Sequence, residues 1–222
     1  MYYTEQVRRI KDKLKTIKSL DRRLEIFGAD YHKYYLGRPA YAHEVAEFEA
    51  KYKITLPPCY KSFITEVGNG GIEYPNSIVG NSAAGPNYGI YKLETLVNVL
   101  IQNTDYLQND FFFNPSMTEA TWENIYENLG QDITDEDYDR HLEKVFSGIL
   151  VIGFCGCSGY QGLVLNGKEK GRVIYLYDEV EYRPHLADES NFLDWYENWL
   201  DDAINKSKVA QPKTVKPWWR VW

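Results

Sequence analysis

Three short apolar runs between Gly148 and Asp178 constrain the fold of this chain more than any other feature. They occupy Ile149–Phe154, Gly162–Leu165 and Val173–Tyr177, and each is rich in Val, Ile, Leu or aromatic residues and bounded by Gly or Asn. Runs of this length and composition are typical of β-strands. We therefore expect three successive strands, which need helices or further strands to cover them.

The joins between these runs indicate how the strands connect. The second join, Asn166–Gly171, combines turn residues with three charges, which predicts an exposed hairpin loop. The first join, Cys155–Gly159, is glycine-rich and made of small residues. Within the first run, Ile149–Ile152 are apolar without alternation, which predicts a strand buried on both faces.

Composition indicates a soluble globular protein, because 44% of the 222 residues are hydrophobic and 26% are charged. No apolar run approaches the length needed to span a membrane, and the N-terminus leads into a charged helix rather than a signal segment. Three cysteines, an odd number, do not form a disulfide framework. We expect one domain in the reducing cytoplasm, without a membrane partner.

Charge is distributed unevenly along the chain. Residues 1–38 carry ten Lys or Arg against five acids, and residues 203–222 carry five bases and no acid. Residues 119–144 and 178–202 each carry nine acids, against two bases and one base respectively. A nucleic-acid-binding protein normally presents a basic face on its core. The acidic centre argues against a nucleic-acid partner and leaves a basic protein partner open.

Helices are expected before the strands. Apolar residues spaced three and four apart predict an amphipathic helix over residues 5–27, ended by Gly28. Its other face is basic, and we favour packing on its own domain with a solvated basic face over the alternative of a partner-binding helix. A second helix is expected at 44–52, and a third begins with Pro58 and ends at Gly68.

The middle of the chain is less regular. We expect a helix at 93–109, a strand at Ile78–Val79, and two helices at 118–129 and from Thr134 to Phe146. Three consecutive aromatic residues, Phe111–Phe113, cannot all face one side of a helix or strand. We favour a loop that plugs the core over an exposed aromatic contact patch.

After the strands, the chain adds an edge strand, a helix and a tail. The edge strand is expected at Val180–Tyr182, within a charged loop. Ser190 can cap a last helix, whose inward residues are Phe192, Trp195, Tyr196, Trp199 and Leu200. The tail ends in Pro217–Trp222, with three Trp in five residues. We favour packing of these Trp on the domain over the alternative of a partner-binding latch.

This order of motifs resembles the SUKH superfamily of Smi/Knr-like proteins. In that family a short helix precedes Leu-Pro-x-x-Tyr, a second helix follows with a large apolar residue, and Asn-Gly-Gly closes it. A glycine-rich strand, a strand ending in Asn-Gly, an aromatic strand and a Phe-x-x-Trp helix come later. The matching residues here are Leu56, Pro57, Tyr60, Phe63, Asn69-Gly70-Gly71, Gly153–Gly162, Leu163–Gly167, Val173–Tyr177, Phe192 and Trp195.

The resemblance covers about residues 42–202 of a single SUKH-like domain spanning 1–222, with 1–38 as an N-terminal helical extension and 203–222 as a basic, Trp-rich tail. It implies an α+β fold, in which a mostly antiparallel sheet is flanked by helices and carries a helical insertion. Bacterial members are mostly immunity proteins that neutralise toxins, often nucleases, delivered between competing cells. Eukaryotic relatives regulate cell-wall synthesis.

The family has no shared set of catalytic residues. The resemblance therefore implies a non-catalytic immunity protein, monomeric or homodimeric, that binds and neutralises a cognate, basic toxin. The alternative is a regulatory scaffold or a small-ligand-binding module of the same Smi/Knr-like type. In that alternative, the glycine-rich bend and Tyr160 line a pocket.

Charge density selects the candidate partner-binding residues. Acids crowd the start of the helix after Thr134, where the helix dipole favours them. They are either a capped helix on a solvated face, which we favour, or a negative surface that docks on a basic toxin. The candidate partner-binding residues are Asp132, Asp135, Glu136, Asp137, Asp139 and Tyr160.

The residues that usually carry metal or nucleophilic chemistry do not form a known motif. None of the four His has a metal-ligand spacing, and Cys155-x-Cys157 lacks a second Cys or His pair. Cys59 lies in the first turn of an amphipathic helix, where a buried thiol is usually inert. We expect no catalytic residue, no metal and no cofactor.

Overall fold

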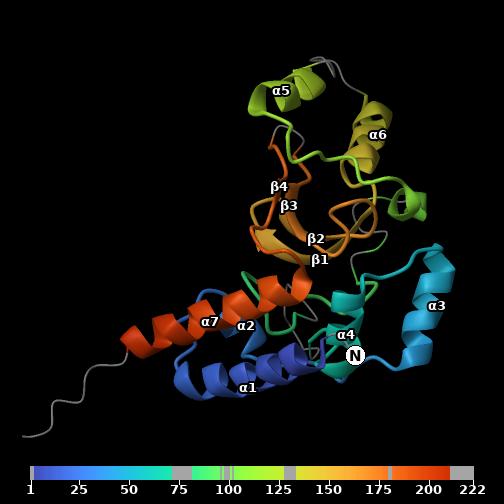
Figure 1. Cartoon of the computed structure of the whole chain (residues 1–222). Helices are drawn as coiled ribbons and strands as arrows, with labels where there is room; N and C mark the ends of the chain where they lie inside the picture. The colour runs from blue at the N-terminus through green and yellow to red at the C-terminus, as the bar shows by residue number, and fades with distance from the viewer. Residues whose placement is uncertain are drawn as a thin grey trace, which may run out of the picture.

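The computed structural model describes residues 3–210, apart from 72–81, 96, 98–100, 102, 128–133 and 180–181. Its centre is a four-stranded antiparallel sheet with the strands in chain order. Together with the helices on both sides of the sheet, this confirms the α+β class (Figure 1). The strands are β1 (Ile149–Gly156), β2 (Gly159–Val164), β3 (Val173–Tyr177) and β4 (His185–Leu186).

The hairpin between β1 and β2 is tighter than predicted. Gly156 pairs with Gly159, so that only Cys157 and Ser158 form the turn. Both have positive φ, 46° and 60°, as a two-residue turn that matches the twist of its strands requires. As a result β2 starts three residues before the predicted run. The prediction that Ile149–Ile152 are buried on both faces is confirmed.

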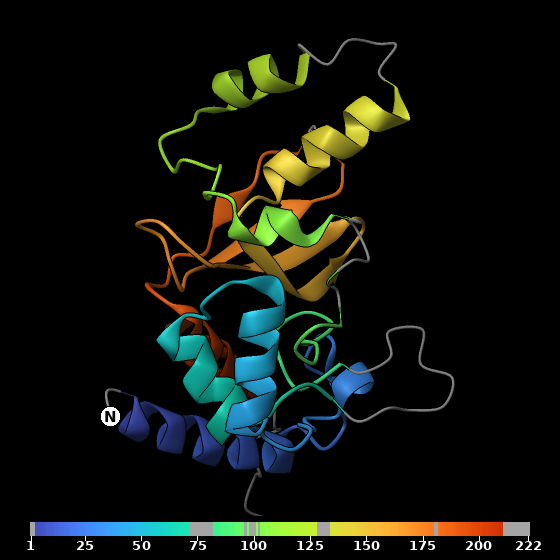
Figure 2. The ribbon, with the colours of Figure 1, turned by 90° about the vertical axis from the view of Figure 1, so that its right-hand side faces the viewer.

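Helices cover both sides of the sheet (Figures 1 and 2). The N-terminal and C-terminal helices lie together on one side, and a second group lies on the other side. The first group is α1 (Thr4–Leu20), α2 (Ala29–His32), α3 (Ala42–Tyr52), α4 (Pro58–Glu66) and α7 (Phe192–Ala210). The second group is α5 (Glu119–Glu127) and α6 (Asp135–Val145).

The residues that carry the family resemblance are structural. Tyr60 and Phe63 of α4 pack their rings on Phe192 of α7, with centroids 4.9 and 5.1 Å apart. The Asn69 side chain accepts a hydrogen bond from the Leu93 amide at 2.8 Å, which holds two segments together. These contacts bury apolar surface and pair backbone groups, so the motif specifies the fold rather than a site.

The first helix is shorter than predicted, because α1 ends at Leu20 rather than near Phe27. The buried Asp21 carboxylate accepts hydrogen bonds from the amides of Glu25 and Ile26, at 2.8 and 3.1 Å. These bonds close a loop in place of the next helical turn. Phe27, the last residue of the predicted helix, is 63% exposed.

The predicted helix at 93–109 is wrong in the part that the structure describes. Residues 93–95 form a turn, and the helical segment is the short 3₁₀ helix η1 (Thr104–Gln108). The Asn103 side chain accepts a hydrogen bond from the Asp105 amide and starts η1 at that point. The predicted strand Ile78–Val79 lies outside the described residues.

The aromatic triplet lies in the core, as the favoured alternative predicts. Phe113 is buried, and Phe111 and Phe112 are half-buried. The Asn166 amide pins this loop, since its oxygen accepts from the Phe111 amide and its nitrogen donates to the Asn109 carbonyl. Near the C-terminal end of the sheet, the described Tyr182 is a bend, and the edge strand is β4 instead.

Candidate functional site

The sequence-predicted acidic residues lie at the N-terminal end of α6. Thr134 caps this helix, because its hydroxyl accepts a hydrogen bond from the Asp137 amide at 3.1 Å. Asp135, Glu136 and Asp139 are exposed. Their carboxylates therefore project into solvent, while Asp132 lies outside the described residues.

Arg140 is the cation that pairs with these acids in the described part of the chain. It contacts Asp137 at 3.0 Å and Glu136 at 3.5 Å, both within α6. Asp135 and Asp139 form no ion pair with any described residue. Exposed pairs of this kind contribute little to stability. The surface therefore presents unpaired negative charge to solvent.

The opposite face of α6 packs on the sheet. Leu142, Val145 and Phe146 are buried there. Tyr138 donates its hydroxyl to the main-chain oxygen of Asp178, immediately after β3. These contacts orient α6 so that its acids face outward.

Tyr160 of β2 lies behind α6. Asp178 connects the two, because it accepts hydrogen bonds from both Tyr138 of α6 and Tyr160. Its hydroxyl donates to the Asp178 carboxylate at 3.2 Å. Burial, with the nearby Asp178 charge, raises the pKa of Tyr160. Tyr160 is therefore a neutral hydrogen-bond donor at physiological pH. The structure brings it under the acidic helix but not onto the exposed acidic face.

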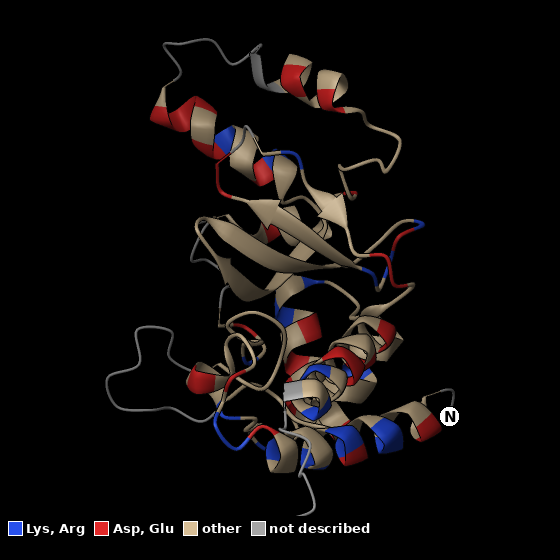
Figure 3. Cartoon of the chain, turned by 90° about the vertical axis from the view of Figure 1, so that its left-hand side faces the viewer, with Lys and Arg blue, Asp and Glu red and all other residues tan. Residues whose placement is uncertain are grey.

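The basic helix α1 lies at the far end of the molecule (Figure 3). Arg9 pairs with Glu197 of α7 at 2.8 Å, and Lys13 pairs with Glu197 and Asp201 at 2.9 and 2.7 Å. The favoured prediction that this helix packs on its own domain agrees with these contacts. However, part of its basic face is paired with α7 rather than solvated.

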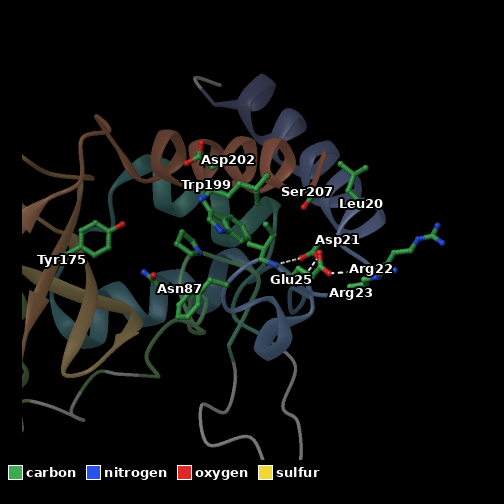
Figure 4. Close-up of a pocket in the computed structure, with 15 residues that line it drawn as sticks. Leu20, Asp21, Arg22, Arg23, Glu25, Asn87, Tyr175, Trp199, Asp202 and Ser207 are labelled. Carbon is green, nitrogen blue, oxygen red and sulfur yellow. Dashed lines mark hydrogen bonds and ion pairs between the residues drawn. The ribbon is translucent and has the colours of Figure 1, made fainter. Parts of the chain in front are cut away.

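Sequence reasoning missed a cavity of about 700 Å³ beside α7 (Figure 4). The loop after α1, the turn at Pro86 and Asn87, Tyr175 of β3 and the outer part of α7 enclose it. Tyr160 does not line this cavity. The cavity exists because α1 ends at Leu20 and the following loop turns away. The residue that closes this loop is the buried Asp21, which cannot be told from an ordinary exposed acid in the sequence.

Burial makes two thiols less reactive, those of Cys59 and Cys155. Burial raises the pKa of Cys59, and it raises the pKa of Cys155 to about 12. Both are thiols rather than thiolates at neutral pH, and the thiolate is the nucleophile. His32 is fully buried, and burial lowers its pKa to about 4.

Two absences hold for the described residues alone. Within them, no group of three or more His, Cys, Asp or Glu side chains is arranged to hold a metal ion. None of the helices in the described ranges combines the length and apolar character that crossing a membrane requires.

A comparison with known families gives one match. The model of the SMI1/KNR4 family (SUKH-1) matches residues 39–198, which run from just before α3 into α7. No curated protein matches the chain. The family match includes the sheet, the cavity-lining residues Pro86 and Tyr175, and the α5–α6 pair.

Proposed function

The chain belongs to the SMI1/KNR4 family (SUKH-1), and we propose that it is a non-catalytic immunity protein that binds and neutralises a basic bacterial toxin. The family is generally of the immunity type. In this chain, we expect the partner to be basic and to dock on the acidic surface of α6. A toxin that acts on nucleic acid carries basic groups to bind phosphates, so it fits this charge.

The observation that supports the proposal is the outward-facing acidic surface of α6. Asp135 and Asp139 form no ion pairs with described residues. Buried apolar residues on the opposite face of the helix hold it on the sheet. A rigid element that presents unpaired charge to solvent is suited to steer an oppositely charged partner. Such complementarity acts mainly on the association rate.

Neutralisation then needs a partner held tightly after the encounter. Tight protein interfaces depend on a few aromatic anchors, with charged residues around them. Tyr182 is 52% exposed, and its ring lies 5.2 Å from that of Tyr177. Tyr177 ends β3, next to the Asp178 that Tyr138 of α6 contacts. We expect Tyr182 to serve as an anchor beside the acidic surface.

The test starts with affinity capture from lysate of the source organism, followed by identification of the bound protein and an assay of its inhibition. The variant Asp135→Lys/Asp139→Lys should lower the association rate of the captured toxin about tenfold or more at low salt. It should also flatten the salt dependence of that rate. The folded state should persist, because both side chains are exposed.

The matched control is Glu47→Lys/Glu66→Lys, which makes the same charge change on α3 and α4. Both residues are exposed and form no ion pair with described residues. If both variants lowered the association rate equally, the toxin would be attracted by the net charge of the whole protein. The acidic surface of α6 would then have no specific role. Capture of no protein that this chain inhibits would overturn the immunity function itself.

A further inference from the structure

The cavity of about 700 Å³ beside α7 has the size of a binding site for a small molecule. Pockets that hold such ligands measure about 300–1,000 Å³ and combine apolar walls with a few well-placed polar groups. The cavity lies between α7 and the loop after α1 (Figure 4). No described residue of α6 lines it, so it is separate from the acidic surface of that helix.

Trp199 of α7 forms an aromatic floor in this cavity. The centroid of its half-buried ring lies 5.2 Å from that of Tyr196 and 6.4 Å from that of Tyr34, so neighbouring rings hold it in place. Ile26 and Ala203 add apolar surface. A planar aromatic ring can therefore stack on this floor at little cost in side-chain entropy.

Two polar groups along α7 are available to an occupant. The hydroxyl of Ser207, a residue only 7% exposed, lines the cavity and forms no hydrogen bond with a described residue. Serine hydroxyls inside helices often donate to the carbonyl four residues earlier, and Ser207 does not. The indole N–H of Trp199 likewise has no partner among the described residues. Both groups can donate hydrogen bonds to an acceptor in the cavity.

Three cations and three acids line the cavity, and their pairing decides which charges an occupant meets. They are Arg22, Arg23 and Lys206, and Asp21, Glu25 and Asp202. The Asp21 carboxylate already accepts hydrogen bonds from two amides of its own loop and from the Tyr34 hydroxyl. Glu25 pairs with Arg23 at 3.9 Å. The charges that pair with no described residue are therefore those of Arg22, Lys206 and Asp202.

These available charges are separated along α7. Lys206 lies about 10 Å along the helix from Trp199, whereas Asp202 lies within one turn of it. Beyond Trp199, a second hollow of about 370 Å³ continues to β4 and adds Asp188 and Glu189. The Trp199 end is therefore acidic and the Ser207 end basic. An anion is favoured at the Ser207 end, and hydrogen-bond donors are favoured beside the aromatic floor.

We propose that this cavity binds a mononucleotide. The base stacks on Trp199, and the phosphate lies at the basic end, where it accepts charge-assisted hydrogen bonds from Arg22 and Lys206. Asp202 accepts hydrogen bonds from the ribose, since an acidic side chain is a common partner of ribose hydroxyls. The ribose also supplies the separation between ring and anion. A nucleoside lacks the anion for the basic end, and inorganic phosphate lacks the ring.

The test is calorimetric titration of the full chain with adenosine monophosphate (AMP), uridine monophosphate (UMP), adenosine and inorganic phosphate. At least one of the two nucleotides should bind about tenfold more tightly than adenosine or phosphate, because only a nucleotide supplies both ring and anion. This affinity should fall as salt is added. Equal affinities for AMP and adenosine, or binding of neither nucleotide, would overturn the proposal. Tighter binding of free tryptophan would replace it with an aromatic amino acid.

A charge reversal at the basic end tests the phosphate position. Lys206→Glu should weaken AMP binding about tenfold and leave adenosine binding unchanged. The matched control is Lys208→Glu, which makes the same change on the same helix outside the cavity and should keep the wild-type affinity. Both side chains are exposed, so the fold should persist. Equal losses in the two variants would mean attraction by net charge and contradict the site.

A change in the aromatic floor should act on both ligands. Trp199→Leu keeps an apolar side chain but removes the stacking ring, and it should weaken AMP and adenosine binding alike, by about tenfold. Circular dichroism checks that the variant is folded. Unchanged AMP affinity in the folded variant would contradict stacking on Trp199. The immunity function does not enter these measurements, so either proposal can fail without the other.

Discussion

The helices α6 and α7 are both rich in acids, yet they use their charge in opposite ways. Glu197 of α7 faces α1 and accepts hydrogen bonds from Gln6, Arg9 and Lys13. Asp135 and Asp139 of α6 face solvent and pair with no described residue. Acid density along the sequence is therefore a poor guide to available charge, because a distant basic helix can neutralise it.

The pKa of Glu197 reflects its pairing with the basic helix α1. Burial alone would raise the pKa of this carboxyl, but hydrogen bonds from Arg9, Lys13 and Gln6 outweigh the effect of burial. They lower the pKa to about 2. The α1–α7 pair thus uses its charges to hold the fold, whereas Asp135 and Asp139 of α6 leave their charges exposed to solvent.

The largest effect concerns how firmly each region joins the core. Ile10 of α1 is fully buried, whereas Ile125 of α5 is only partly buried. Ile10→Ala should lower the free energy of unfolding by about 3 kcal/mol, and Ile125→Ala by about 1 kcal/mol, because a deeper cavity costs more. Urea denaturation measures both. Equal losses would mean that α5 is as integral to the core as α1.

An intermediate effect concerns the paired carboxylate. Since its pKa is lowered in the folded state, Glu197 stabilises the fold fully above pH 4.5, and this stabilisation is lost as the pH falls toward 2. We expect a loss of about 1–2 kcal/mol over that range, because the half-exposed Arg9 is partly screened by solvent. Glu197→Gln should remove this pH dependence in urea titrations.

The control for this titration is Asp139→Asn, a change in an exposed acid of α6 that pairs with no described residue. It should keep the wild-type slope between pH 4.5 and 2. His32, with a pKa near 4 in the folded protein, adds a separate loss of stability between pH 6.5 and 4 in all three proteins. The difference in pH dependence between the two variants therefore reports on Glu197 alone. If both variants showed the same slope of unfolding free energy against pH, the contrast between α6 and α7 would be wrong.

The smallest effect concerns the local stability of α6. Thr134→Ala removes the hydroxyl that caps the helix and should cost about 1 kcal/mol or less. Faster amide exchange should be confined to α6 and absent from α7. A change that spreads to α7 would show that the two regions unfold as one unit.

Much of the fold could be predicted because local patterns dominate it. The apolar runs of the sheet, the proline that opens α4 and the threonine that caps α6 act through their own neighbours. The helix predicted at 93–109 failed for the opposite reason. There the side chain of Asn69, far away in the sequence, binds the Leu93 amide, and Asn103 starts a short 3₁₀ helix.

The sequence by itself determined the family, the α+β class and the position of the acids on α6, because each depends on motif order or on spacing within one element. Only the tertiary structure decided which acids are available and where the cavity lies. Arg9 and Glu197 are 188 residues apart, and Asp21 closes its loop by hydrogen bonds that no periodicity encodes. Contacts between distant segments depend on how the elements pack, which apolar spacing alone does not specify.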